Sequence, residues 1–179
     1  MFYGLAQTGN LKEERGSNLL DGGAPFYGTY ETSDGGWIAV GAIEAKFYAV
    51  LVEAIGLKLE DLPDQLDEST WPELRARFAA IFLTRTRDEW CEVLQPLESC
   101  FAPVLSYAEA YEHEHHVARE SFIEVDGVKQ PAPAPRFSRT PGGVSRGSAK
   151  PGEHTDEALV DWGFDAAEVA ALRESGAIA

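Results

Sequence analysis

Glu44 is the residue whose type and position are most suggestive of acid–base chemistry. It follows Val40-Gly41-Ala42-Ile43, at a point where an expected strand gives way to an expected helix. Its carboxylate therefore lies near a helix N-terminus, where the dipole favours the ionised form. An ionised carboxylate there can orient and stabilise an imidazolium, the supporting role in a histidine–carboxylate pair. The alternative is a first-turn acid that supports only its own helix, and the spacing alone favours this alternative.

Two further segments carry residue types that bind ligands. His113, His115 and His116 are of the type that binds metals, but adjacent residues on a helix point in different directions and no second ligand set follows. We expect a solvated or locally bonded helix face there, and no metal site. The glycines of Asn18–Pro25 allow a ligand to approach the backbone closely. The stretch lacks the Walker and dinucleotide spacings, however, and can equally be a turn that leads into a hairpin.

The composition limits the partners that the chain can bind. Its 179 residues include 15 Lys and Arg against 30 Asp and Glu, which gives a formal net charge of −15. Nucleic acids and anionic membranes both favour a basic protein surface, so we expect neither as a partner. The same charge argues against unaided binding of a polyphosphate cofactor.

Features of a secreted or membrane protein are not expected either. No apolar run reaches the ~20 residues that span a bilayer, and neither end of the sequence shows a targeting signal. Cys91 and Cys100 are too few for a disulfide scaffold, and we expect both to be buried, reduced thiols. The expected location is the cytoplasm.

Hydrophobic periodicity predicts an α+β domain that positions these residues. The alternating pattern of 26–43, interrupted by Ser33-Asp34-Gly35-Gly36, predicts a β-hairpin. Four helices are expected to follow, at about 45–55, from about 72, from about 87, and in pieces over about 107–120. Gly56 fits the position after the first helix, and Thr86 with Glu89 fits a capping box of the third. The first helix is expected to bury Phe47, Val50, Leu51 and Ala54, and the third Trp90, Val93, Leu94 and Leu97. A short extended segment at 101–105 precedes the last of them. A second hairpin is expected around Asp126-Gly127.

The last third of the chain changes character at Pro131. From there to Gly152, Pro, Gly, Ser and Ala dominate, and no acid occurs between Asp126 and Glu153. This pattern indicates either a solvated linker or a basic strip that crosses an acidic or phosphate-bearing partner. Two short helices are expected after it, the first capped by Thr155 and the second by Asp165 with Glu168. Each has an apolar side that needs a surface to dock on.

A series of motifs runs through nearly the whole chain in a fixed order. The two most specific are Leu19-Leu20-Asp21-Gly22-Gly23-Ala24-Pro25 and Gly41-Ala42-Ile43-Glu44. The others are Phe47-Tyr48, Trp71-Pro72-Glu73, Glu89-Trp90-Cys91, Cys100-Phe101-Ala102-Pro103-Val104-Leu105, Arg119-Glu120-Ser121-Phe122, Pro133-Ala134-Pro135 and Gly152-Glu153-His154-Thr155. In this combination the chain resembles the C-terminal half of the α-methylacyl-CoA racemases, a branch of the family III CoA-transferases.

The resemblance implies a chain that is incomplete as an enzyme. It implies a crossing segment at 1–24, a small α+β domain with β-hairpins and several helices at 25–130, a return linker at 131–152 and a C-terminal helical segment at 153–179. In the family, a large Rossmann-like domain binds most of CoA and carries the catalytic His and Asp, so the isolated chain is expected to be inactive. Family subunits interlock, so the expected partner is a second copy or a chain that supplies the large domain.

The resemblance also implies roles for particular residues. Glu44 looks like the carboxylate that supports the catalytic histidine, although Ala45-Lys46 stands where a Pro-Gln pair is usual. Tyr27 and Ile43 would line the acyl pocket near the thioester. The residues expected near the pantetheine or the acyl chain are Leu19, Leu20, Gly22, Gly23 and Ala24.

The implied reaction is 1,1-proton transfer at the α-carbon of a 2-methylacyl-CoA, through an enolate held at the thioester. Because the thioester itself acidifies the α-proton, no metal or redox cofactor is expected, and CoA is part of the substrate. CoA transfer within the same family remains an alternative, although it depends on an Asp nucleophile in the absent half and the Gly-Ala-Ile-Glu motif disfavours it. A non-catalytic dimerisation or scaffold subunit is an alternative of another class.

Overall fold

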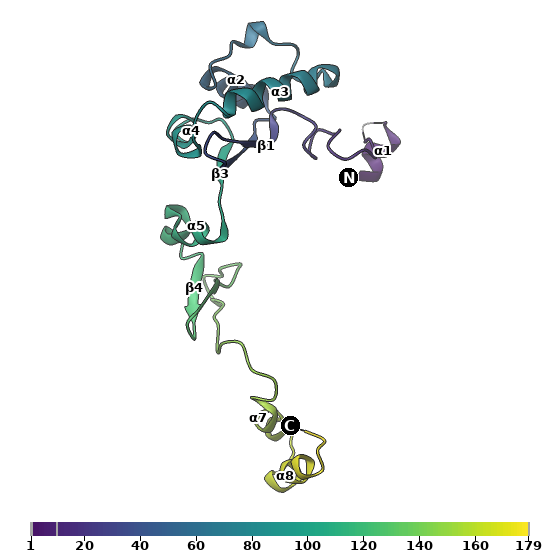
Figure 1. Cartoon of the computed structure of the whole chain (residues 1–179). Helices are drawn as coiled ribbons and strands as arrows, with labels where there is room; N and C mark the ends of the chain where they lie inside the picture. The colour runs from purple at the N-terminus through teal and green to yellow at the C-terminus, as the bar shows by residue number, and fades with distance from the viewer. Residues whose placement is uncertain (1, 10, 179) are drawn as a thin grey trace. The chain divides into compact units, whose positions relative to one another are not determined.

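The computed structural model describes residues 2–9 and 11–178, and it contains two compact units, Met1–Ala108 and Glu109–Ala179. Each unit combines helices with one small antiparallel sheet (Figure 1). The expected α+β class is therefore confirmed. The two units are described separately below.

The first unit is built on a three-stranded antiparallel sheet in the order β1-β2-β3. Strands β1 (Tyr27–Glu31) and β2 (Trp37–Gly41) form the predicted hairpin, with Tyr30 opposite Ile38. The turn is closed by the amide of Thr32, which donates to the carbonyl of Gly36 over 2.9 Å. Strand β3 (Phe101–Val104) pairs with the other edge of β2 and corresponds to the expected extended segment.

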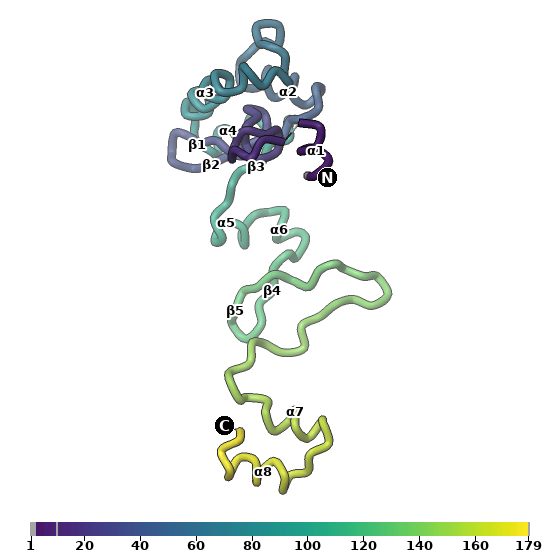
Figure 2. The backbone as a smooth tube through the Cα atoms, turned by 90° about the vertical axis from the view of Figure 1, so that its right-hand side faces the viewer, coloured from purple at the N-terminus to yellow at the C-terminus, as the bar shows by residue number. Residues whose placement is uncertain are grey.

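The helices of this unit are α1 (Phe2–Gln7), α2 (Ala45–Ala54), α3 (Trp71–Phe82) and α4 (Arg87–Leu94), with 3-10 turns at Leu59–Asp61 and Glu68–Thr70. Figures 1 and 2 show α2 and α3 on the same side of the strands. Two predicted boundary signals are confirmed. Gly56, with a φ of +81°, follows the end of α2, and Thr86 with Glu89 forms the capping box of α4.

An aromatic and aliphatic core lies between the sheet and the helices. Side chains alternate along a strand, so Tyr30, Ile38 and Val40 point toward the helices. The helices contribute Tyr48, Leu51, Val52, Trp71, Leu74, Phe78, Phe82, Trp90 and Leu94 to the same core.

The sequence expectations about burial in this unit hold only in part. In α2, Leu51 is buried and Phe47 and Ala54 are half-buried against the core, as expected, but Tyr48 and Val52 are buried as well. Leu97 is exposed because α4 ends at Leu94. Cys100 is exposed as well, in the turn that leads into β3.

The second unit contains a two-stranded hairpin and two pairs of short helices. Helix α5 (Tyr107–Glu112) begins at the division between the units and is followed by α6 (Glu114–Ala118). Strands β4 (Phe122–Val125) and β5 (Val128–Pro131) form the second predicted hairpin. Asp126 and Gly127 both have positive φ, 51° and 77°, as the expected Asp-Gly turn requires.

Residues 132–154 contain no helix or strand and correspond to the expected connection. Within it, Arg136 donates to the carbonyl of Glu120 over 2.6 Å, and Arg146 pairs with Glu157 through two contacts of 3.1 and 3.2 Å. Helices α7 (Thr155–Asp161) and α8 (Ala166–Glu174) follow. The residue before α7 is His154, not Thr155 as expected, whereas Asp165 and Glu168 form the expected capping box of α8.

None of the helices in the described part of the chain is long and apolar enough to span a membrane.

We predict that replacing Phe78 with Ala strongly destabilises the first unit. Phe78 has no exposed surface and packs against the rings of Tyr30 and Phe82, at centroid distances of 6.3 and 6.4 Å. Its loss leaves a cavity in the aromatic core, so the free energy of unfolding should fall by about 3–5 kcal/mol. Urea denaturation followed by tryptophan fluorescence measures the change.

The matched control is Leu83→Ala, just beyond the same helix, where the side chain is 49% exposed and the loss should stay within about 0.5 kcal/mol. Equal losses in the two variants would contradict the described core.

Candidate functional site

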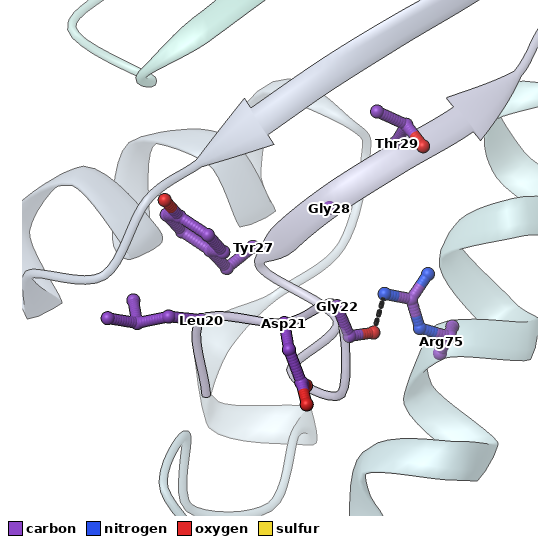
Figure 3. Close-up of a pocket in the computed structure, with 7 residues that line it drawn as sticks. All are labelled: Leu20, Asp21, Gly22, Tyr27, Gly28, Thr29 and Arg75. Carbon is purple, nitrogen blue, oxygen red and sulfur yellow. Dashed lines mark hydrogen bonds between the residues drawn. The ribbon is translucent and has the colours of Figure 1, made fainter. Parts of the chain in front are cut away.

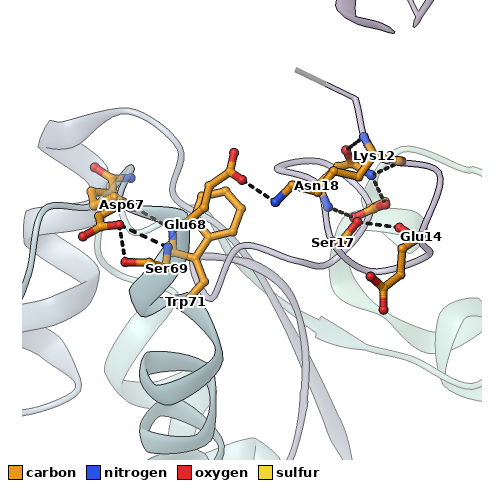
Figure 4. A network of polar contacts seen from close by, with 10 residues as sticks. Lys12, Glu14, Ser17, Asn18, Asp67, Glu68, Ser69 and Trp71 are labelled. Carbon is orange, nitrogen blue, oxygen red and sulfur yellow. Dashed lines mark hydrogen bonds and ion pairs between the residues drawn. The ribbon is translucent and has the colours of Figure 1, made fainter. Parts of the chain in front are cut away.

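The segment that precedes β1 is folded by its own polar contacts (Figure 4). The Asn18 side-chain amide donates to the carbonyl of Lys12 over 3.0 Å and to the carboxylate of Asp21 over 2.7 Å. Lys12 in turn forms an ion pair with Glu68, at 2.6 Å. The hydrogen bond from the Asn18 side chain is the main cause that lowers the pKa of the Asp21 carboxylate. The predicted ligand-binding loop is therefore an ordered turn that lies against the start of α3.

Position 23 requires glycine because the backbone folds back closely on itself there. A Cβ atom at this position would lie 2.7 Å from the carbonyl oxygen of Asn18, and the Gly23 amide donates to that same oxygen over 3.0 Å. The next residue, Ala24, has no exposed surface, and Leu19 packs against the core. The predicted proximity of these three residues to a pantetheine or acyl chain stays a prediction.

A hollow of about 450 Å³ lies on the surface between this loop, β1 and α3 (Figure 3). Three residues expected at the substrate, Leu20, Gly22 and Tyr27, come together in its wall. The remaining lining residues are Asp21, Gly28, Thr29 and Arg75. Sequence reasoning missed Arg75, because a single arginine on an amphipathic helix is indistinguishable from a solvated one until the fold brings it to the loop.

Arg75 and Tyr30 together hold the loop. An Nη2 hydrogen of Arg75 is donated to the carbonyl of Gly22, and the guanidinium lies 5.3 Å from the centre of the Tyr30 ring. The hydroxyl of Tyr30 donates to the carbonyl of Pro25 over 2.6 Å, inside the core. Burial raises the pKa of Tyr30 to about 12, and the positive charge of Arg75 opposes part of that rise.

Glu44 lies at the N-cap position of α2. Its backbone is extended, with φ −71° and ψ 137°, and its carbonyl accepts from the amides of Phe47 and Tyr48 over 2.9 and 3.0 Å. Its exposed side chain makes no capping hydrogen bond, and no hydrogen bond or ion pair joins the carboxylate to another described residue. Helix α2 begins at Ala45 despite the unusual Ala45-Lys46 pair. A carboxylate is thus presented outward at the positive end of a helix.

The turn that carries Glu44 is fixed from two sides. The side chain of Gln65 donates to the carbonyls of Ile43 and Ala42, over 2.9 and 3.2 Å. On the other side, the amide of Gly41 donates to the carbonyl of Cys100 over 2.8 Å. Ile43 itself is half-buried against the core, next to the position of the carboxylate. The backbone at Glu44 is therefore held without using its side chain.

Both cysteines are free thiols, and neither is activated. Burial raises the pKa of the Cys91 thiol. The pKa of Cys100 is also raised, first by desolvation and then by the negative charges of Glu44 and Glu98. A raised pKa lowers the thiolate fraction at neutral pH, so neither residue has the character of a nucleophile.

His113, His115 and His116 lie in the second unit and pack on one another. The rings of His113 and His115 lie 5.6 and 5.7 Å from that of His116, which in turn contacts Phe122 edge-on at 5.6 Å. Among the residues with assigned positions, no group of three or more His, Cys, Asp or Glu is placed to hold a metal ion.

The first unit thus has a sheet with helices α2 and α3 on one side and an exposed carboxylate at a strand-to-helix turn. Comparison with known proteins identifies the family of this chain. The chain belongs to CoA-transferase family III, whose sequence profile matches residues 1–155. It is 46% identical over 167 residues to the α-methylacyl-CoA racemase of Mus musculus, and 43% identical over 158 residues to that of Homo sapiens. These alignments cover 92% and 87% of this chain but only 44% and 41% of the relatives, so the chain spans less than half of their length.

More distant similarities are found as well. The beta subunit of succinyl-CoA–L-malate CoA-transferase from Chloroflexus aurantiacus is 28% identical over 173 residues, which is 88% of this chain and 41% of the subunit. A solved structure of a mutant of Rv3272 from Mycobacterium tuberculosis matches 87% of this chain and 42% of that chain, with a TM-score of 0.61 and 17% identity. This structural similarity shows a shared fold. The expected resemblance to the racemase branch is confirmed by the two racemase alignments.

We predict that the stability of the chain falls between about pH 10 and pH 12 because of Tyr30. Its pKa of about 12 in the folded protein exceeds the ordinary value of 10.0, so folding favours the neutral hydroxyl. This contribution is fully present below pH 10 and is lost as the pH rises through 12. Urea denaturation at successive pH values measures the slope.

Tyr30→Phe should be less stable at pH 8, since the carbonyl of Pro25 loses its donor. The same variant should show a shallower alkaline slope, and burial also raises the pKa of Tyr48, Cys91 and Cys100, which contribute to the slope that remains. An unchanged slope would contradict the described burial of Tyr30.

Proposed function

We propose that this chain is the C-terminal part of an α-methylacyl-CoA racemase. The reaction inverts the 2-methyl centre of an acyl-CoA thioester by 1,1-proton transfer. The observation that carries the proposal is the identity of 46% and 43% to two racemases across about nine-tenths of the chain, against 28% to a CoA-transferase of the same family. The outward carboxylate of Glu44 supports it.

Glu44 acts in this proposal as a positioning residue for a histidine that the other half of the enzyme supplies. Its carboxylate accepts a hydrogen bond from one imidazole N–H, which leaves the second ring nitrogen free to take the α-proton. Once the imidazole has become an imidazolium, the negative charge stabilises it. A carboxylate that caps its own helix would have to give up that bond first. Glu44 makes no such bond.

The hollow at Leu20, Gly22 and Tyr27 is the proposed site for the acyl or pantetheine part of the substrate. Leu20 and Tyr27 offer apolar surface there, and Ile43 lies beside Glu44 in the sequence. The thioester carbonyl accepts the electron pair left when the α-proton departs, so the mechanism calls for no metal or redox cofactor. With a net charge of −15, this chain is poorly suited to the CoA phosphates, which we assign to the other half.

The same proposal gives the chain its domains and its partner. Residues 1–24 form the crossing from the large domain, 25–130 the small domain, 131–152 the return linker and 153–179 the segment that packs back. The partner is a second copy of the family subunit or a chain that supplies the large domain. Trp162, at the end of α7, is 87% exposed, which is a large apolar surface for a segment that would dock on another domain.

The proposal predicts a specific loss of proton exchange in Glu44→Gln. The chain is mixed with a polypeptide that supplies the first half of a racemase relative, and deuterium incorporation at the α-carbon of a 2-methylacyl-CoA is followed in deuterium oxide. Gln cannot stabilise an imidazolium by charge, so kcat should fall by roughly a hundredfold. The matched control is Glu53→Gln, an exposed acid near the other end of α2, which should leave the rate unchanged.

Other outcomes separate the alternatives. A rate for Glu44→Gln equal to that of the unsubstituted chain would remove Glu44 from the mechanism. Formation of a new acyl-CoA from an added carboxylic acid, without α-proton exchange, would identify CoA transfer instead. A mixture that assembles but catalyses neither reaction would leave the scaffold alternative.

A further inference from the structure

Arg75 reaches the loop from helix α3 and passes close to Gly28 of β1 (Figure 3). Its Nη2 group donates to the carbonyl of Gly22, a contact between residues 53 positions apart in the sequence. Helix α3 and β1 pack together in the first unit, so the backbone on either side of this contact is fixed by the core. The contact joins the loop that precedes β1 to helix α3, in addition to the Lys12–Glu68 ion pair near the start of that helix.

The path of the Arg75 side chain depends on the absence of a side chain at Gly28. A Cβ atom there would lie 2.7 Å from Nη2 of Arg75 and 3.5 Å from its Nη1. Any larger residue at position 28 would therefore displace the guanidinium from the Gly22 carbonyl. Gly28 and Arg75 line the same hollow, so this close approach occurs at the proposed substrate site.

The side chains of Arg75 and Tyr30, which stack on each other, hold two backbone carbonyls of the segment from Gly22 to Pro25. Arg75 binds the carbonyl of Gly22, and Tyr30 binds that of Pro25. The guanidinium also lies over the Tyr30 ring, at 5.3 Å. A planar guanidinium can donate hydrogen bonds at its edge while its face stacks on a ring, whereas the ammonium of lysine cannot do both in the same geometry.

We propose that Arg75 is a positioning residue that fixes the Leu20–Gly22 wall of the hollow and thereby sets the affinity for the acyl-CoA substrate. The second part rests on the proposed function, and the first does not. Arg75 acts through the Gly22 carbonyl and makes no contact with Glu44 among the described residues. Its removal should therefore weaken substrate binding and leave the proton-transfer step largely unaffected.

The first test measures amide hydrogen exchange in the chain itself. The reporter is the Gly23 amide, which donates to the carbonyl of Asn18 inside the loop. Arg75→Met keeps the apolar stem and removes the donors, so exchange at Gly23 should rise by about tenfold, the usual effect of losing one hydrogen bond from a charged group. Arg75→Lys should give an intermediate rise. Arg77→Met, on an exposed position of the same helix, is the matched control and should give none.

A second variant covers the case in which Arg75→Met unfolds the unit. Gly28→Ala displaces the guanidinium and leaves Arg75 in place, so it should raise exchange at Gly23 in the same way. In the double variant the two effects should not add, because both substitutions remove the same contact, between Arg75 and the Gly22 carbonyl. Unchanged exchange at Gly23 in a folded Arg75→Met chain, or full additivity with Gly28→Ala, would overturn the positioning role.

The second test measures kinetics in the mixture with the large domain. Arg75→Met should raise the KM for the 2-methylacyl-CoA by about tenfold with kcat nearly unchanged, and Arg75→Lys should restore part of the affinity. Raised exchange at Gly23 with an unchanged KM would overturn the link to the substrate while leaving the loop contact standing. An unsubstituted mixture without activity would count against the proposed function, and the exchange experiment would still decide whether Arg75 holds the loop.

Discussion

The site in the first unit depends on the way in which Tyr30 is buried. The alternation of β1 turns its ring toward α3, where it packs on Phe82 at 5.0 Å and on Phe78 at 6.3 Å. Its hydroxyl reaches the carbonyl of Pro25, and its ring faces the guanidinium of Arg75. One side chain thus belongs both to the aromatic core and to the support of the loop. Loosening the core would therefore be expected to loosen the wall of the hollow as well.

The side chain of Glu44 makes no hydrogen bond or ion pair with another described residue. The start of α2 is held by backbone contacts and by Gln65, and the exposed carboxylate makes no capping hydrogen bond to the helix that it precedes. Natural helices often use an acid at this position to bind their own amides. An acid that is not used in this way is available to a group from outside. This availability is the physical basis for assigning Glu44 a role toward a histidine of another domain.

The sequence was most informative about local structure. Both hairpins, the capping boxes at Thr86 and Asp165, and the end of α2 at Gly56 depend on neighbouring residues, and all were predicted. The face of α2 was predicted only in part, because Phe47 and Tyr48 are both apolar enough to be core candidates. Only the packing partners decide between them.

The candidate site was predictable only in part. The motif resemblance led to Leu20, Gly22 and Tyr27, which the fold brings to one hollow. Arg75 could not be found in this way, because its contact with Gly22 joins residues 53 positions apart. Gly23 was expected near a ligand, and the structure shows a backbone reason for it that the sequence alone did not reveal. Long-range contacts of this kind follow from the fold and have no local signal.

We propose that this chain supplies a supporting carboxylate and one wall of a racemase site, and that the acid–base groups come from elsewhere. The most direct measurement is deuterium incorporation at the α-carbon of a 2-methylacyl-CoA in deuterium oxide, followed by proton NMR. It compares this chain alone, the large domain alone and the two mixed. The account predicts exchange in the mixture and none with either part alone. Exchange by this chain alone, or a folded, assembled mixture that exchanges no proton, would contradict it.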